Sequence, residues 1–274
     1  MQEYCNYEKI MKNIERIKEG DVLYVVSDIL ELTKICKRNG EKFDRNRFID
    51  TIIEKVGITG TVLIPTFNWD FCKGKTFDYL HTPSQTGALG NAALGRKDFK
   101  RTKHPIYSFA VWGKDKELLC NMDSKSSFGK ETVFDYMVKK HGKSLVIGLP
   151  TMAGIAVFHH VEEMVGVPFR FNKDFAGNYV DENGNVEEKT YSMYVRDLEI
   201  NAKEETAPLN HILEALNVSN TQIINEIPFR TVYLQELYLI EEMDIKYNDC
   251  RNMYCYKGQT PQKELTEKYE WNLG

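Results

Sequence analysis

The feature that most constrains the fold is the alternation of short apolar runs with segments of helical periodicity. Four apolar runs of strand length occur along the chain, at residues 20–28, 61–67, 107–112 and 144–149. Segments with helical spacing or a helix-capping residue lie around them, at residues 7–18, 29–38, 44–56 and 133–140. Strands that alternate with helices indicate an α/β protein. We expect a three-layer α/β/α sandwich around a parallel or mixed sheet.

The pattern changes in the C-terminal part of the chain. Residues 181–185 read DENGN, a signal of a hairpin turn, and a strand-like run follows at residues 191–195. We therefore expect an antiparallel β extension near residues 171–200, then a helix at 209–216 and a strand followed by a helix within 231–240. The interpretation is one domain over residues 1–274, with a C-terminal subregion from about residue 171 to 250.

The composition excludes several classes of function. The chain has 274 residues and a formal net charge of −4 with both signs mixed, which argues against nucleic-acid binding but allows a small phosphate pocket. It contains no run of 18 apolar residues, and its N-terminus lacks the apolar core of a signal peptide. We therefore expect no membrane association and a cytoplasmic location. Among six cysteines only Cys250 and Cys255 lie close in sequence, and no second pair completes a zinc site, so no metal is expected.

The stretch VFHHVEEM, residues 157–164, concentrates titratable groups on a predicted helix. His159 and Glu162 are three positions apart and are therefore neighbours on the helix surface, as are His160 and Glu163. A carboxylate that holds a histidine fixes its tautomer and stabilises the imidazolium, which is the arrangement of a general base. Periodicity alone does not choose between the two couples, and a solvated helix face without function is the alternative.

Three other segments have the composition of a phosphate site. Arg101 lies in a basic cluster just before the third strand, and Ser108 lies near the start of that strand. Residues 82–87, TPSQTG, offer hydroxyl and backbone N–H groups to an anion, and residues 125–132, KSSFGKET, end at a helix N-terminus. Each segment has a plain structural alternative, namely a surface turn or a helix cap.

The order of these segments resembles the aminoglycoside 3-N-acetyltransferase family, which comprises antibiotic N-acetyltransferases outside the common GNAT fold. The blocks that carry the resemblance lie between about residues 20 and 170 and follow the family order. They are GDVLYVVSD (20–28), IPTF (64–67), TPSQTGAL (82–89), RTKHPIYSF (101–109), SSFG (126–129), LVIGL (145–149), HHVE (159–162) and VPFR (167–170).

The resemblance implies roles for individual residues. In the family a glutamate precedes the Val-Pro proline by six residues, which here selects Glu162 before Pro168, and hence His159 as its partner. His159 is then expected to act as general base, oriented by Glu162, while His160 and Glu163 are expected to be surface bystanders. Residues expected to bind the CoA co-substrate or the oxyanion are Ser27, Asp28, Ser84, Arg101 and Ser108, and those expected on the acceptor side are Asp70, Asn91 and His104.

The implied activity is transfer of an acyl group from an acyl-CoA, chiefly acetyl-CoA, to a primary amine of an amino sugar, without a metal. Asn91 stands where antibiotic-modifying members commonly carry a glutamate that is expected to meet a cationic substrate. The favoured acceptor is therefore a nucleotide-linked amino-deoxy sugar of cell-surface glycan synthesis. The alternatives are an aminoglycoside acceptor and a non-catalytic module that binds CoA or a sugar nucleotide. A homo-oligomer is compatible with the sequence.

Overall fold

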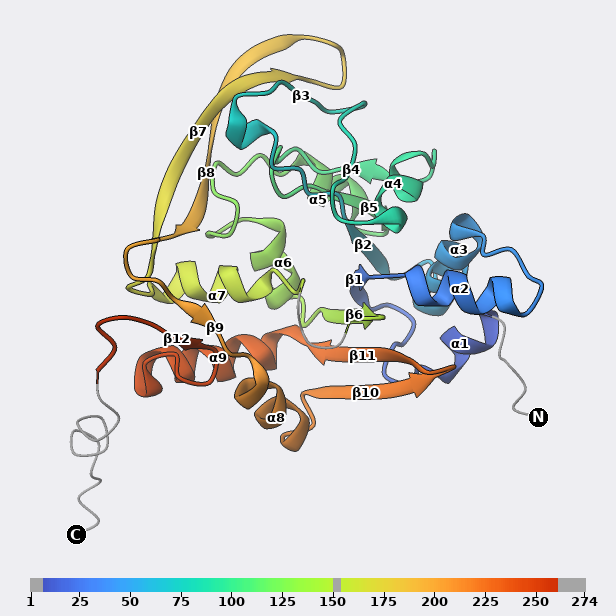
Figure 1. Cartoon of the computed structure of the whole chain (residues 1–274). Coiled ribbons are helices and arrows are strands. Elements are labelled where there is room, and N and C mark those ends of the chain that lie inside the picture. Colours follow the sequence, from blue (N-terminus) through green and yellow to red (C-terminus); the bar gives the residue numbers. More distant parts are fainter. Residues whose placement is uncertain (1–6, 150–153, 261–274) are drawn as a thin grey trace.

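A seven-stranded mixed sheet forms the centre of the protein (Figure 1). The computed structural model describes residues 7–149 and 154–260. In sheet order the strands are β10 (Ser219–Ile224), β11 (Ile227–Tyr233), β6 (Lys143–Ile147), β1 (Val22–Ser27), β2 (Thr61–Pro65), β5 (Phe109–Gly113) and β4 (Lys100–Arg101). Strand β1 pairs in parallel with β2 and β6, and the outer strands pair antiparallel. The sheet is therefore mixed.

Helices cover both faces of this sheet (Figure 1). Alternate residues of β1 serve opposite faces, with Leu23 and Val25 in one hydrophobic core and Tyr24 and Val26 in the other, as the two-residue period of a strand requires. The first core is covered by α1 (Tyr7–Asn13), α2 (Leu30–Arg38), α3 (Arg45–Val56) and α4 (Ala88–Leu94). The second is covered by α5 (Lys116–Asn121), α6 (Val133–Lys139), α7 (Val157–Val165), α8 (Ala207–Ala215) and α9 (Leu234–Asn248). The predicted three-layer α/β/α sandwich is confirmed.

A long hairpin extends from the sandwich and arches along one side of the molecule (Figure 1). Its strands β7 (Arg170–Val180) and β8 (Val186–Arg196) pair antiparallel over their full length, and the tip of β7 adds the short strand β3 (Phe77–Asp78). At the turn Asp181 accepts backbone hydrogen bonds from Asn183 and Asn185 through Oδ1, each 2.8 Å long. The predicted antiparallel extension is therefore confirmed.

Other elements were not predicted because their sequences are short or lack a clear period. They include α5, the edge strand β10, the 3-10 helix η1 (Phe71–Lys73), and the two-stranded sheet of β9 (Lys203–Glu204) and β12 (Tyr254–Cys255). The strand predicted from residue 231 begins earlier, at Ile227, and helix α9 continues to Asn248. Helix α9 ends where Asp249 adopts a left-handed conformation with φ 54°. Within the described residues, no helix has the length and apolar character needed to cross a membrane.

Candidate functional site

A cavity of about 370 Å³ opens at the edge of the sheet where the parallel strands β1 and β2 end. Ligand sites of α/β sheets commonly form at the carboxyl ends of parallel strands. Its wall combines these strand ends with the start of α7 and with the β9 and β12 segments. The lining residues are Val26, Ser27, Pro65, Phe67, Trp69, Thr86, Tyr107, Leu149, Gly154, Ile155, Ala156, Phe158, His159, Glu204, Thr206, Met253 and Tyr254.

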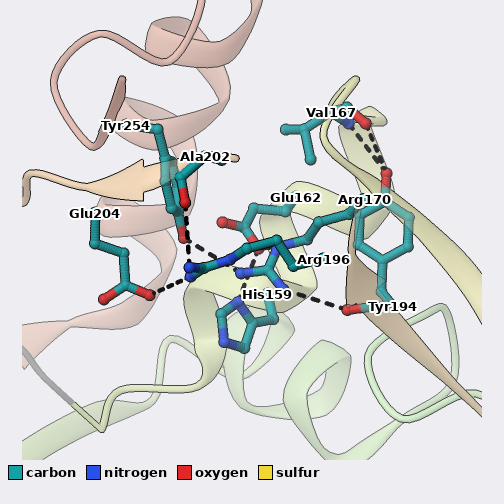
Figure 2. Close-up of polar contacts among 9 residues, drawn as sticks. All are labelled: His159, Glu162, Val167, Arg170, Tyr194, Arg196, Ala202, Glu204 and Tyr254. Carbon is teal, nitrogen blue, oxygen red and sulfur yellow. Dashed lines mark hydrogen bonds and ion pairs between the residues drawn. The ribbon is translucent and has the colours of Figure 1, made fainter. Parts of the chain in front are cut away.

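His159 and Glu162 form a hydrogen-bonded couple at this wall. His159 Nδ1 lies 2.8 Å from Glu162 Oε2 (Figure 2). The side chain of His159 is 26% exposed and lines the cavity, whereas that of Glu162 is 1% exposed. A carboxylate at Nδ1 favours the tautomer with the proton on Nδ1, which leaves Nε2 as the acceptor of a proton. The couple thus has the geometry of a general base held by a buried carboxylate.

Arg170 is a second cationic partner of Glu162, beside His159. Its Nε lies 2.8 Å from Glu162 Oε2, and its Nη2 donates to the Tyr254 hydroxyl at 3.4 Å (Figure 2). Burial raises the pKa of Glu162, but His159, Arg170 and the Tyr254 hydroxyl together outweigh burial and hold this pKa below its ordinary value. Glu162 is therefore a carboxylate over the neutral pH range and can stabilise an imidazolium at His159.

The second couple of the VFHHVEEM stretch does not form, and the prediction that His160 lies at the surface is wrong. His160 is 1% exposed because its side of α7 packs against α6 and α9. Its Nδ1 pairs with the Phe128 carbonyl, and burial lowers its pKa. Glu163 is half-buried and accepts a hydrogen bond from Ser126 Oγ at 2.8 Å. Both residues therefore serve the packing of α7.

Ser27, predicted to bind CoA, lines the cavity and also an adjoining cleft of about 490 Å³. Thr86 lines both spaces as well, so the two are contiguous. Asp28 lines the adjoining cleft, where its Oδ1 accepts the backbone N–H of Leu30 at 2.9 Å. Ser84 is buried and lines neither space, but its Oγ accepts the Thr86 backbone N–H at 3.1 Å. Ser84 thus supports the wall of the cavity rather than facing a ligand.

Arg101 and Ser108 lie outside both spaces, which argues against their predicted contact with CoA phosphates. Arg101 is 3% exposed and donates from Nε to Ser108 Oγ at 3.0 Å. Its other nitrogens donate to the carbonyls of Tyr79, Thr82 and Thr66. The guanidinium of Arg101 donates its hydrogen bonds to backbone carbonyls and a buried hydroxyl. These bonds hold residues 79–82 against the sheet.

Asp70 and Asn91, both predicted on the acceptor side, make their polar contacts outside the cavity. Asp70 forms ion pairs with Lys73 at 3.3 Å and Lys75 at 2.9 Å, and these two lysines lower its pKa. Asn91 spans its own loop, since its amide accepts from the Ser84 N–H and donates to the Ser84 carbonyl, both at 2.9 Å. Neither residue lines the cavity.

His104, also predicted on the acceptor side, does not line the cavity. Its Nδ1 accepts the backbone N–H groups of Ile106 at 3.3 Å and Tyr107 at 3.1 Å. Burial lowers the pKa of His104 to about 3, so the ring is neutral and fixes the turn before β5. Within residues 7–149 and 154–260, no three His, Cys, Asp or Glu side chains gather as a metal site.

Sequence reasoning missed the C-terminal part of the wall. Glu204, Thr206, Met253 and Tyr254 come from β9, β12 and the residues beside them. A strand of two residues is too short to show a periodic pattern, so the sequence offered no signal for these positions. Arg170 was visible as the last residue of the VPFR block, but its pairing with Glu162 was not predicted.

A second buried carboxyl group, Glu241, lies on the face of α9 that packs against α7. It is 1% exposed, and both of its oxygens lack a hydrogen-bond partner within the described part of the chain. Burial raises its pKa well above the ordinary value; Glu162 and Asp244 add to this effect, and Arg170 opposes it. The native state therefore keeps a proton on Glu241 at a pH where the unfolded chain has lost it.

This raised pKa predicts that Glu241 destabilises the protein at neutral and alkaline pH. Its full contribution to stability is present below the unfolded pKa and is lost as pH rises toward the folded pKa. We expect Glu241→Leu to raise the free energy of unfolding by about 1–3 kcal/mol at about pH 8. The gain should be smaller at about pH 5, as measured by urea unfolding at both values. Glu236→Leu, at an exposed position of the same helix, is the control. An equal gain at both pH values would contradict the prediction.

The sandwich, the His159–Glu162 couple and the cavity define an α/β enzyme fold with a candidate proton-accepting site. The family model described as aminoglycoside 3-N-acetyltransferase matches residues 25–243. The chain therefore belongs to the aminoglycoside 3-N-acetyltransferase family, and it is an N-acyltransferase that moves an acyl group from CoA to an amine. A search of curated proteins gave no match.

Solved structures of the same fold include three informative neighbours. Sisomicin-bound AAC-VIa has a TM-score of 0.72 at 16% identity, covering 89% of this chain and 99% of that one. AAC-IIIb in a binary complex with CoASH has a TM-score of 0.73 at 15% identity, covering 94% and 100%. The YokD protein from Bacillus subtilis has a TM-score of 0.70 at 17% identity, covering 91% and 96%. At these identities the likeness establishes the fold.

Proposed function

We propose that this protein transfers the acetyl group of acetyl-CoA to an amine of an aminoglycoside. The observation that carries the proposal is the His159–Glu162 couple, with its 2.8 Å hydrogen bond, at the wall of a cavity of about 370 Å³. Family membership supports the reaction class. The CoASH complex of AAC-IIIb and the sisomicin complex of AAC-VIa support the choice of co-substrate and acceptor.

The mechanism assigns the proton to His159. An amine attacks the thioester carbonyl only when its lone pair is free, and it must lose a proton as the amide forms. His159 Nε2 takes this proton while Nδ1 stays bound to Glu162, whose negative charge stabilises the imidazolium. A carbon–nitrogen bond forms and the carbon–sulfur bond breaks, so that CoA leaves as a thiolate. The imidazolium then provides the proton that converts the thiolate to the thiol.

The two contiguous spaces suggest how CoA is held. The adjoining cleft is lined by Arg45 at the start of α3 and by Gly87 before α4. A phosphate of CoA in this cleft would meet the Arg45 guanidinium. The thioester arm would pass Ser27 and Thr86 into the cavity that holds His159. In this arrangement Ser27 and Asp28 contact CoA, as the family resemblance implied. Arg101 and Ser108 do not contact CoA.

The acceptor differs from the one favoured by the sequence. A nucleotide-linked amino sugar finds no support among the matched proteins, and the aminoglycoside alternative fits them better. The nucleotide-linked sugar was favoured because Asn91 stands where the family resemblance implies a glutamate. Because the Asn91 amide is engaged with its own loop, that position says little about the charge of the acceptor.

The proposed function is tested by release of CoA thiol from acetyl-CoA in the presence of an amine panel. The panel holds kanamycin, sisomicin, apramycin, a nucleotide-linked amino-deoxy sugar and a simple amino sugar. We expect thiol release with one or more aminoglycosides and an N-acetylated product by mass spectrometry. Preferential acetylation of the nucleotide-linked sugar would overturn the acceptor assignment. CoA binding without thiol release across the panel would instead identify a non-catalytic binding module.

A further inference from the structure

Glu204 is the carboxylate exposed in the wall of the cavity. Among the described lining residues, the acidic and basic side chains are those of Glu204 and His159. Strand β9 pairs Glu204 with Tyr254 of β12, and the Tyr254 hydroxyl accepts a hydrogen bond from Arg170, the partner of Glu162. Glu204 and His159 therefore line the same cavity, and Figure 2 shows the Glu204 carboxylate turned toward Arg196.

Glu204 is bound by an arginine from outside the cavity lining. Arg196, the last residue of β8, places Nη2 at 2.8 Å from Glu204 Oε1 and donates from Nη1 to the Ala202 carbonyl at 3.2 Å (Figure 2). The two side chains are 34% and 56% exposed. An ion pair with this exposure gains little from its charges, so another cation can replace Arg196 at small cost.

We propose that Glu204 binds an ammonium group of the acceptor and that Arg196 occupies this carboxylate until the acceptor displaces it. This rests on the proposed function and narrows it. With one amine at His159 Nε2 and a second ammonium at Glu204, the preferred acceptor carries at least two amino groups. Arg196 pairs with the carboxylate when the site is free. When the acceptor binds, its ammonium group, which has the same charge as Arg196, takes the place of Arg196.

The experiment measures steady-state kinetics of four variants with a polyamino acceptor. We expect Glu204→Gln to raise the acceptor KM about tenfold with the KM for acetyl-CoA unchanged, since a charged hydrogen bond is lost. Glu205→Gln, the same change at the next residue and outside the lining, should leave both constants unchanged. Arg196→Gln should lower the acceptor KM about two- to fivefold because the competing cation is gone. In the Glu204→Gln background, Arg196→Gln should have no effect on this KM.

Several results would overturn the proposal. An equal rise in KM for Glu205→Gln would show a general effect of surface charge. A rise in KM for Arg196→Gln would show that Arg196 binds the acceptor, as an anionic acceptor would require. If Glu204→Gln raised the KM of a monoamine sugar by the same factor, Glu204 would not be binding a second ammonium group of the acceptor.

Failure of the proposed function is recognised separately. If the wild-type protein releases no thiol with any amine, the catalytic proposal fails while acceptor binding remains measurable. Trp69 lines the cavity, so its fluorescence reports titration with the same polyamino compound. If Glu204→Gln raises this dissociation constant about tenfold, the ammonium site at Glu204 is supported even without catalysis. An unchanged dissociation constant rejects the ammonium site.

Discussion

Replacing His159 with alanine is expected to lower kcat by about two to four orders of magnitude. The amine then has no imidazole in the cavity wall to take its proton, because the Nε2 atom is removed. Binding of CoA should change little, since the adjoining cleft does not include His159. Stopped-flow or steady-state thiol release, combined with direct CoA titration, separates these two effects.

The neighbouring histidine is the matched control for this result. His160→Ala removes a buried ring that pairs with the Phe128 carbonyl, so we expect a loss of stability. Its kcat per folded molecule should stay near that of the wild type. A loss of kcat in His160→Ala equal to that of His159→Ala would contradict the assignment of the base. Near-normal turnover by His159→Ala would show that the acceptor amine needs no protein base.

The second large effect is expected from Arg170→Met. Arg170 is 7% exposed at its side chain and is the cation that faces the buried Glu162. Removing one partner of a buried ion pair leaves an uncompensated charge and costs about 3–5 kcal/mol. We therefore expect a fall of this size in the free energy of unfolding near neutral pH, measured by urea or thermal unfolding. Arg196→Gln, which breaks an exposed pair, should lose less than about 1 kcal/mol.

The pH dependence of Arg170→Met gives a sharper criterion. In the wild type the depressed pKa of Glu162 contributes stability above the unfolded pKa, and this contribution is lost as pH falls through the folded pKa. Without Arg170, His159 still lowers the pKa of Glu162 but the opposing effect of burial is less well compensated, so the stability that Glu162 contributes above its unfolded pKa should be smaller. Glu162→Gln in the Arg170→Met background should recover part of the loss. Absence of any recovery would show that Arg170 acts through packing alone.

The sequence predicted the sandwich well because its signal is local. The runs at residues 20–28, 61–67 and 144–149 became β1, β2 and β6, whose side chains alternate between two buried faces. The turn at residues 181–185 was equally readable, since Asp181 and Gly184 carry the turn chemistry within five residues.

The candidate site was predicted only in part because its contacts are long-range. The family resemblance, through the spacing to Pro168, selected His159 and Glu162, but the burial of His160 depends on α9, about 80 residues later in the chain. Arg101 has the composition of a phosphate ligand, yet it is consumed by the carbonyls of Thr66, Tyr79 and Thr82. No local pattern reveals such partners.

The small sheet of β9 and β12 has a consequence for synthesis of the protein. The His159–Glu162 couple leaves the ribosome well before Tyr254, which completes the wall around it. A nascent chain that ends before β12 therefore carries the base and its carboxylate without Tyr254, the partner of the Arg170 guanidinium. Docking of this late segment is therefore the step that completes the wall around the couple.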